Sequence, residues 1–237
     1  MHTQLDLHGN IPVFIDLSDA AQSDSVALDN LIIEAGSIYI LDRGYVDFKR
    51  LYYFVNNLAF FIVRAKKNLA YRRLYSHPVD REIGVRSDQV IKLTSKQSTK
   101  NYPDKLRRIK FYDNENKRYL IFLTNNFTLP AKTIADLYKS RWQVELFFKW
   151  IKQHLKIKSF FGTSRNAVYA QIWIAISAYV LVAIVKKRLK IDKSLYSILQ
   201  FLSIALFHKI PIFTALNDIQ EIHNNYQISK QLNLFRY

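Results

Sequence analysis

The order of apolar and polar positions predicts a chain in which strands and helices alternate. Two runs that alternate apolar and polar side chains flank Gly9-Asn10, and this arrangement is typical of a β-hairpin over residues 2–8 and 11–17. Helical and strand spacing then follow one another along the chain. The predicted elements are a helix over 25–35 that ends at Gly36, a strand over 37–41, a helix over 48–58 and a strand over 59–64.

The pattern changes beyond residue 64. Runs rich in β-branched residues, Tyr and Arg occupy 72–75, 83–93 and 106–124. Four polar residues over 113–116 separate two apolar runs, which predicts a hairpin turn. We therefore expect an all-β, basic segment over residues 65–129.

The rest of the chain is predicted to be helical. A long helix over 131–156 follows Pro130, and further helices are expected over 166–188 and 194–207, whereas the pattern after residue 210 is weakly determined. The run 167–185 contains no charged residue and reaches the length at which a helix can cross a membrane. Its polar residues favour a fully buried core helix, and a membrane span is the alternative.

Composition and charge narrow the functional classes. The 237 residues are 49% hydrophobic, enough for a real core, and contain no cysteine. A disulfide scaffold, a cysteine-ligated zinc site and a cysteine nucleophile are therefore excluded. The net charge is +16, from 35 Lys and Arg against 19 Asp and Glu. Such a charge favours a polyanionic partner, with a basic surface kept for solubility as the alternative.

The charge is unevenly distributed. Residues 1–42 contain seven acidic residues and no Lys or Arg, whereas residues 43–118 contain nineteen basic and seven acidic residues. Residues 119–237 contain sixteen basic and five acidic residues. An acidic opening followed by a basic chain suggests one region that binds cations and another that binds phosphates.

Four polar residues of the helix predicted over 131–156 fall on one stripe. Tyr138, Arg141, Glu145 and Lys152 would lie within an arc of about 60° beside the apolar face. A carboxylate held beside two cations and a phenol fits a site for a metal ion and phosphate. The alternative is ordinary surface ion pairing of Glu145 with Arg141 and Lys149.

Asp42 is the second candidate. It follows a short apolar strand and precedes Arg43-Gly44-Tyr45. Ligands of open α/β sheets gather at the carboxyl ends of strands, so Asp42 is well placed to bind a metal. An Asp that only caps a turn is the alternative.

Together these residues resemble a known family. The run Tyr138-x2-Arg141-x3-Glu145-x6-Lys152 is similar to the Tyr-Arg-Glu-Lys signature of bacterial insertion-sequence DDE transposases, in the group typified by insertion sequence four. The residues 41–48 resemble the segment around the second catalytic aspartate of that family, and the opening residues 2–12 resemble the segment before it. The resemblance covers nearly the whole chain.

The resemblance implies an α/β fold with a ribonuclease-H-like core. An all-β insertion would lie between the second catalytic Asp and the catalytic Glu. Residues 1–64 would form the first part of the core, residues 65–129 the basic insertion, and residues 130–237 the catalytic helix and the C-terminal helices. The basic β segment predicted above lies in that gap.

The resemblance also implies a catalytic mechanism. Family members bind two divalent ions, normally Mg²⁺, for which Mn²⁺ can substitute, through two Asp and one Glu, and carry out an in-line displacement at phosphorus. Asp42 and Glu145 would be the second and third carboxylates. The DNA phosphates would be contacted by Tyr138, Arg141, Lys152 and Arg43.

The implied activity is cleavage and transfer of DNA strands at transposon ends. The partner would be double-stranded DNA with terminal inverted repeats, bound by a homo-oligomer in the cytoplasm at the nucleoid and not at a membrane. One departure is that the family's first Asp falls upstream of Met1, so we expect an N-terminally truncated chain. Asp6 or Asp16 could substitute, and the alternative function is an inactive remnant that binds DNA or inhibits the full enzyme. A general nuclease or RNA-binding protein of the same fold is a weaker alternative.

Overall fold

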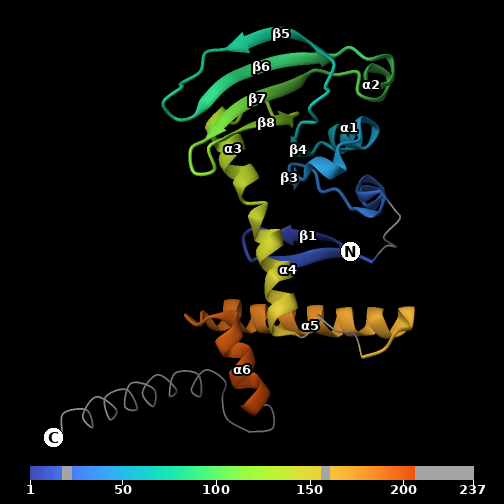
Figure 1. The fold of residues 1–237 in the computed structure, drawn as a ribbon, viewed down its shortest axis with the longest axis vertical. Coiled ribbons are helices and arrows are strands. Elements are labelled where there is room, and N and C mark those ends of the chain that lie inside the picture. The colour runs from blue at the N-terminus through green and yellow to red at the C-terminus, as the bar shows by residue number, and fades with distance from the viewer. Residues whose placement is uncertain (18–22, 156–160, 206–237) are drawn as a thin grey trace, which may run out of the picture. The chain divides into compact units, whose positions relative to one another are not determined.

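The computed structural model describes residues 1–17, 23–155 and 161–205 (Figure 1). The chain divides into two compact units. The first comprises residues 1–5 and 13–146, and the second comprises residues 6–12 together with the chain from Phe147 onward. The tail after residue 210, for which the sequence gives only a weak pattern, lies outside the described residues.

The chain opens with the predicted hairpin. Strands β1 (His2–Asp6) and β2 (Ile11–Asp16) form a two-stranded sheet. Asn10 in the turn adopts a φ of 51°, in the left-handed region that Asn tolerates better than most residues. The prediction of a hairpin around Gly9-Asn10 is therefore confirmed.

A six-stranded mixed sheet forms the centre of the first unit, in the order β3-β4-β8-β7-β6-β5. Strands β3 and β4 are parallel, and every other neighbouring pair is antiparallel. The parallel pair requires a crossover, which α1 supplies. The strands are β3 (Ile38–Leu41), β4 (Phe60–Arg64), β5 (Tyr71–His77), β6 (Val85–Leu93), β7 (Leu106–Asp113) and β8 (Arg118–Thr124).

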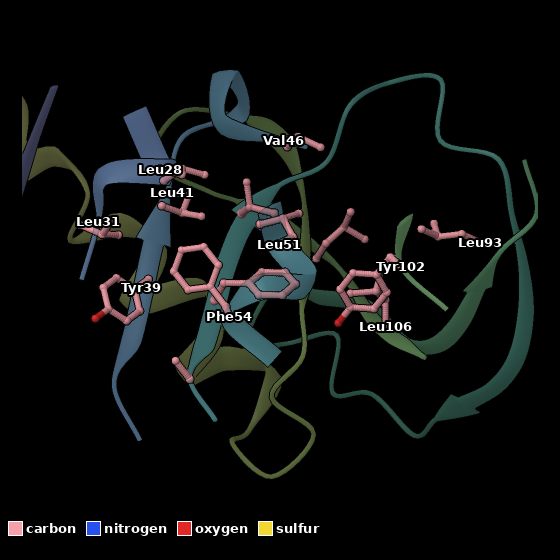
Figure 2. Packing of buried hydrophobic residues seen from close by; sticks show 14 of the residues in the cluster. Leu28, Leu31, Tyr39, Leu41, Val46, Leu51, Phe54, Leu93, Tyr102 and Leu106 are labelled. Carbon is pink, nitrogen blue, oxygen red and sulfur yellow. The ribbon is translucent and has the colours of Figure 1, made fainter. Parts of the chain in front are cut away.

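Helices cover both faces of this sheet. Helix α1 (Phe48–Asn56) packs on one face, where Leu51, Phe54 and Phe61 are almost completely buried. Figure 2 shows the aromatic rings of Tyr39, Phe54 and Tyr102 gathered in this cluster. Helix α3 (Ala131–Lys139) packs on the other face, against a separate cluster of alternate strand residues: Ile62, Val85, Ile109, Phe111, Leu120 and Phe122. Because successive strand residues point to opposite faces, β4, β7 and β8 each contribute residues to both clusters.

The all-β insertion predicted over 65–129 is not confirmed. Strands β5 to β8 continue the same sheet as β3 and β4, with β8 hydrogen-bonded directly to β4 (Figure 1). The segment also contains a short helix, α2 (Lys96–Asn101), which Ser95 caps through its side chain. Ser95 favours the start of α2 because its side chain caps the first turn. The sequence analysis missed this helix because the residues on either side have a strand pattern.

The single helix predicted over 131–156 is two helices. Helix α3 ends at Lys139, and α4 (Trp142–His154) begins after a tight turn. In the turn the backbone N–H groups of Ser140 and Arg141 donate to carbonyls three residues back, those of Leu137 and Tyr138. These bonds span three residues instead of four and interrupt the α-helix. The predicted stripe of Tyr138, Arg141, Glu145 and Lys152 assumed a continuous helix, so it is wrong across residue 140.

The helix predicted over 25–35 is also shorter than expected. A 3₁₀ helix spans only Asp24–Asn30, and Leu31 leaves it in an extended conformation. Gly36 does adopt a positive φ of 78°, but in a turn where its N–H donates to the carbonyl of Leu58 rather than as a helix cap.

The second unit contains α5 (Arg165–Leu189) and α6 (Leu195–Ala205), as the sequence predicts. The ring of Tyr179 on α5 contacts Phe147 and Trp150 of α4. Helix α5 is long and apolar enough to cross a membrane by length and composition, the one such helix in the described part of the chain. Only 28% of its most apolar stretch is buried, so the prediction of a fully buried core helix is wrong.

Candidate active site

Asp42 stands at the carboxyl end of the parallel pair of strands. Strand β3 ends at Leu41, which pairs with Val63 of β4. Asp42 then caps a 3₁₀ turn, because its Oδ1 accepts a hydrogen bond of 2.7 Å from the backbone N–H of Arg43. Oδ2 does not take part in this cap, and the side chain is 53% exposed. Asp42 can therefore cap the turn through Oδ1 and still offer Oδ2 to a metal ion.

Arg141 brings the two predicted carboxylates together. Its Nη2 donates to Glu145 Oε1 at 2.6 Å, and its Nη1 lies 3.5 Å from Asp42 Oδ2. Glu145 lies in the first turn of α4, one turn beyond Arg141. Although burial lowers the pKa of Arg141, the hydrogen bond that it donates to Glu145 and the charge of Asp42 raise this pKa overall. One guanidinium thus holds two carboxylates that are separated by a hundred residues.

Tyr138 lies at the buried side of this group. It is 7% exposed, and its ring packs against Phe122 at a centroid distance of 4.7 Å. Burial raises the pKa of Tyr138, and the charge of Asp42 raises it further, whereas the nearby charges of Arg141 and Arg64 act in the opposite direction. The phenol therefore remains protonated at neutral pH and can donate a hydrogen bond.

Two further residues at this loop were not predicted as site residues. Burial and the charges of Asp24 and Asp42 raise the pKa of Tyr45 to about 12. The Tyr45 hydroxyl lies 2.8 Å from His2 Nδ1. A Cβ at Gly44 would lie 2.6 Å from the carboxylate of Asp24. The absence of a side chain at Gly44 therefore allows Asp24 to lie close to this loop. Gly44 was the one sequence signal that could have indicated a close neighbour here.

No contact with Arg141 or Glu145 is observed for the other predicted site residues within the described ranges. Arg43 has an exposed position, and it contacts Asp42 through its backbone. Lys152 is exposed on α4 and belongs to the second unit, so its role remains a prediction. Asp6 also belongs to the second unit, where its carboxylate binds His8, and Asp16 ends β2.

The donor set at Arg141 suits a divalent ion of the magnesium type. Asp42 and Glu145 offer carboxylate oxygens that already face one cationic group. Mg²⁺ commonly binds one or two protein carboxylates and takes its remaining ligands from water and substrate phosphates. Within residues 1–17, 23–155 and 161–205, no three His, Asp or Glu side chains lie together as a metal cluster. The two carboxylates therefore fit the ion, with substrate oxygens needed to complete its coordination.

Comparison with known proteins identifies the family. Residues 1–181 match the family described as "Transposase DDE domain". A protein of Sinorhizobium fredii named as transposase y4zB is 37% identical over 190 residues, which cover 78% of this chain and 52% of that protein. A protein of Geobacillus stearothermophilus, named as a transposase for the insertion sequence element IS5377, is 36% identical over 154 residues, which cover 63% of this chain and 40% of that protein.

A third relative is more distant. A protein of Synechocystis, named as a transposase for the insertion sequence element IS4SA, is 24% identical over 191 residues, which cover 77% of this chain and 51% of that protein. The chain therefore spans about half the length of the curated relatives that it matches. Since the match to the family extends over three quarters of its residues, this chain belongs to the transposase DDE domain family.

Proposed function

We propose that this chain is a catalytic domain that cleaves and transfers DNA strands at the ends of an insertion sequence. The observation that carries the proposal is the convergence of Asp42 and Glu145 on the Arg141 guanidinium, at the carboxyl edge of β3 and β4. The mixed sheet with helices on both faces is compatible with a ribonuclease-H-like core, which we propose as the fold. Strands β5 to β8 would then be an extension of the core sheet.

Asp42 and Glu145 would bind Mg²⁺ or Mn²⁺ through their carboxylate oxygens. A bound divalent ion activates the attacking oxygen and stabilises the leaving oxygen of a phosphoryl transfer. Both carboxylates are about half exposed, with side-chain exposures of 53% and 44%, so substrate can reach them. A cation that binds Glu145 Oε1 or Asp42 Oδ2 would compete with Arg141 for these oxygens.

The cationic side chains would position the DNA backbone. A guanidinium binds phosphate as readily as carboxylate, so Arg141 can exchange its carboxylate partners for a phosphate of the bound strand. The protonated phenol of Tyr138 lies beside it, ready to donate to a phosphate oxygen. Arg43 and Lys152, which are both exposed, would also contact DNA phosphates.

The partner proposed for the site is double-stranded DNA that carries the terminal inverted repeats of the element, bound by a homo-oligomer. The net charge of +16 supports a polyanionic partner. The cytoplasm, at the nucleoid, is the compartment that such a substrate implies.

Cleavage of labelled duplex DNA tests the proposal. The 237-residue chain should nick DNA that carries the element's own ends when Mg²⁺ is present. Asp42→Asn and Glu145→Gln should each lower the nicking rate by at least about a thousandfold while leaving DNA binding unchanged. Glu115→Gln is the matched control, since this exposed Glu pairs only with Lys139 among the described residues.

Two outcomes would reject the proposal. Equal nicking by the parent and by Glu145→Gln would remove this residue from the chemistry. Salt-sensitive DNA binding without any nicking by the parent would favour the non-catalytic DNA-binding remnant instead.

A further inference from the structure

Three cations on the sheet of the first unit are stacked on tyrosine rings. The Arg108 guanidinium lies over Tyr71, at 5.0 Å from the ring centroid. Lys110 Nζ lies 4.5 Å from the centroid of Tyr119. A third pair joins Arg86 to the ring of Tyr112 at 5.4 Å. A cation over an aromatic face is held by the ring quadrupole, so each of these charges has a fixed position.

The strand register places these side chains on one face. Along β7, Arg108 and Lys110 alternate with Ile109, and they share their face with Leu106, which packs in the cluster beneath α1. Tyr119 of β8 pairs with Tyr112 of β7, and the two rings touch. The neighbours Ile109 and Phe111 point to the opposite face, beneath α3.

Part of this face is open. The cluster beneath α1 and α2 includes Leu106 and Leu93 at one end of the strands. At the other end Tyr119 is 55% exposed, and Arg108, Lys110 and Tyr112 are partly exposed. We call Arg86, Arg108, Lys110 and their three tyrosines the cation–tyrosine face.

The cations of the cation–tyrosine face form no ion pair within the described part of the chain. Among the described residues, no carboxylate lies within 4 Å of the charged groups of Arg86, Arg108 or Lys110. Arg108 donates to the neutral side chain of Gln89, at 3.2 Å. The Nε of Arg86 is buried, and no residue in the described ranges accepts a hydrogen bond from it. Fixed positive charges without a carboxylate are complementary to an anion.

We propose that the cation–tyrosine face binds the phosphate backbone of duplex DNA. Each ring already carries a cation on one side, which favours phosphate contacts over stacking of bases. Arg108 and Lys110 lie about 6.7 Å apart along β7, close to the separation of neighbouring phosphates on one DNA strand. The choice of DNA among polyanions rests on the proposed function.

This surface is distinct from the candidate active site. Tyr138, which adjoins Arg141 and Asp42, packs in the cluster beneath α3, on the other face of the sheet. The cation–tyrosine face therefore binds a segment of DNA other than the one at the carboxylates, either farther along the same duplex or in a second duplex.

Charge reversal on the two faces of the same strands tests the inference. The variant Arg108→Glu/Lys110→Glu changes the cation–tyrosine face. The matched control Arg72→Glu/Lys92→Glu changes an exposed, directly paired couple that alternation places on the opposite face. Fluorescence anisotropy would give the dissociation constant of the 237-residue chain for a 30-base-pair duplex of random sequence and for a 30-nucleotide poly(dT) strand, at several salt concentrations.

The inference predicts a loss of duplex affinity of about tenfold or more in the test variant, with a salt slope reduced by about two. The control should lose less than about threefold. An equal loss in both variants, no loss in the test variant, or a loss confined to poly(dT) would overturn the inference. Arg108→Gln/Lys110→Gln, which removes charge without reversing it, guards against misfolding and should reduce the slope by about the same amount.

The duplex-binding test and the nicking test of the proposed function can fail independently. Nicking by Asp42→Asn and Glu145→Gln tests the carboxylates, whereas duplex binding by Arg108→Glu/Lys110→Glu tests the cation–tyrosine face. Glu115→Gln, outside both sites, should bind the random duplex as the parent does. If the parent fails to nick DNA but the reversal variant still loses duplex binding, the catalytic proposal fails and the surface remains.

Discussion

Two arginines in the first unit bind carboxylates in opposite ways. Arg107 and Asp88 form a bidentate pair, with distances of 2.9 Å and 2.7 Å, and each side chain is only 6% exposed. The remaining nitrogen of Arg107 donates to the backbone carbonyls of Asn126 and Leu129. Arg141 instead lies between two carboxylates that are about half exposed, at 2.6 Å and 3.5 Å.

The difference separates a structural ion pair from an exchangeable one. Every guanidinium nitrogen of Arg107 has a protein acceptor, and the two backbone bonds fix the loop that leads into α3. Removal of either partner would leave a charge buried and unpaired. Solvent reaches the group around Arg141, so its partners can be exchanged at small cost. Burial, rather than the residue types, distinguishes the two arrangements.

The largest expected effect is on the buried pair. Arg107→Ala should lower the free energy of unfolding by about 3–5 kcal/mol, because Asp88 would remain buried without a partner. Urea denaturation of the 237-residue chain, followed by circular dichroism, would measure the change. A loss below about 1 kcal/mol would contradict the structural role assigned to the pair.

Removal of the other arginine should have little effect on stability. Arg141→Ala should cost less than about 1 kcal/mol in the same denaturation experiment. It should also raise the affinity for Mn²⁺ by about two- to tenfold, because both carboxylates lose a competing cation. Isothermal titration with MnCl₂ would measure the change, and a weaker affinity would mean that Arg141 supports the metal site instead of competing with the ion.

A buried polar group without a partner sharpens the contrast with Arg107. The Tyr102 side chain is 1% exposed, and its hydroxyl has no hydrogen-bond partner among the described residues. Tyr102→Phe keeps the ring contacts with Phe61 and Tyr52 and removes this hydroxyl. We expect a gain of about 1 kcal/mol in the free energy of unfolding. A loss of similar size would show that the hydroxyl is satisfied in solution.

The smallest effect concerns pH. The folded pKa of Tyr45 is about 12, above its usual value of 10.0, because of burial and the charges of Asp24 and Asp42. The folded state therefore retains a proton that the unfolded state loses, and stability falls as the pH rises from 10 towards 12. Tyr45→Phe should make this decline shallower than in the parent. Thermal melts at pH 9, 10 and 11 would test the difference, and an unchanged decline would contradict it.

Local patterns in the sequence predicted most of the elements. The hairpin at Gly9-Asn10, the strand that ends at Leu41 and helices α5 and α6 follow from alternation, spacing and turn residues. The sequence did not predict that β8 would pair with β4, because that contact is between residues sixty apart and depends on the sheet as a whole.

The candidate site was predicted in its residues but not in its geometry. Asp42, Arg141 and Glu145 were singled out, yet the calculated stripe assumed one helix through residue 140. The break at that residue arises from backbone bonds that helical periodicity does not reveal. The cation–tyrosine face was missed because it requires the register of four strands, in which residues such as Tyr71 and Arg108 become neighbours.

Direct metal binding tests the central claim, that Asp42 and Glu145 together bind a divalent ion. Electron paramagnetic resonance would follow free Mn²⁺ during titration of the parent, Asp42→Asn, Glu145→Gln and the control Glu115→Gln. Each of the two site variants should weaken Mn²⁺ binding by at least about tenfold, and the control should bind Mn²⁺ as the parent does. Binding of Mn²⁺ by Asp42→Asn and Glu145→Gln with the affinity of the parent would contradict the claim.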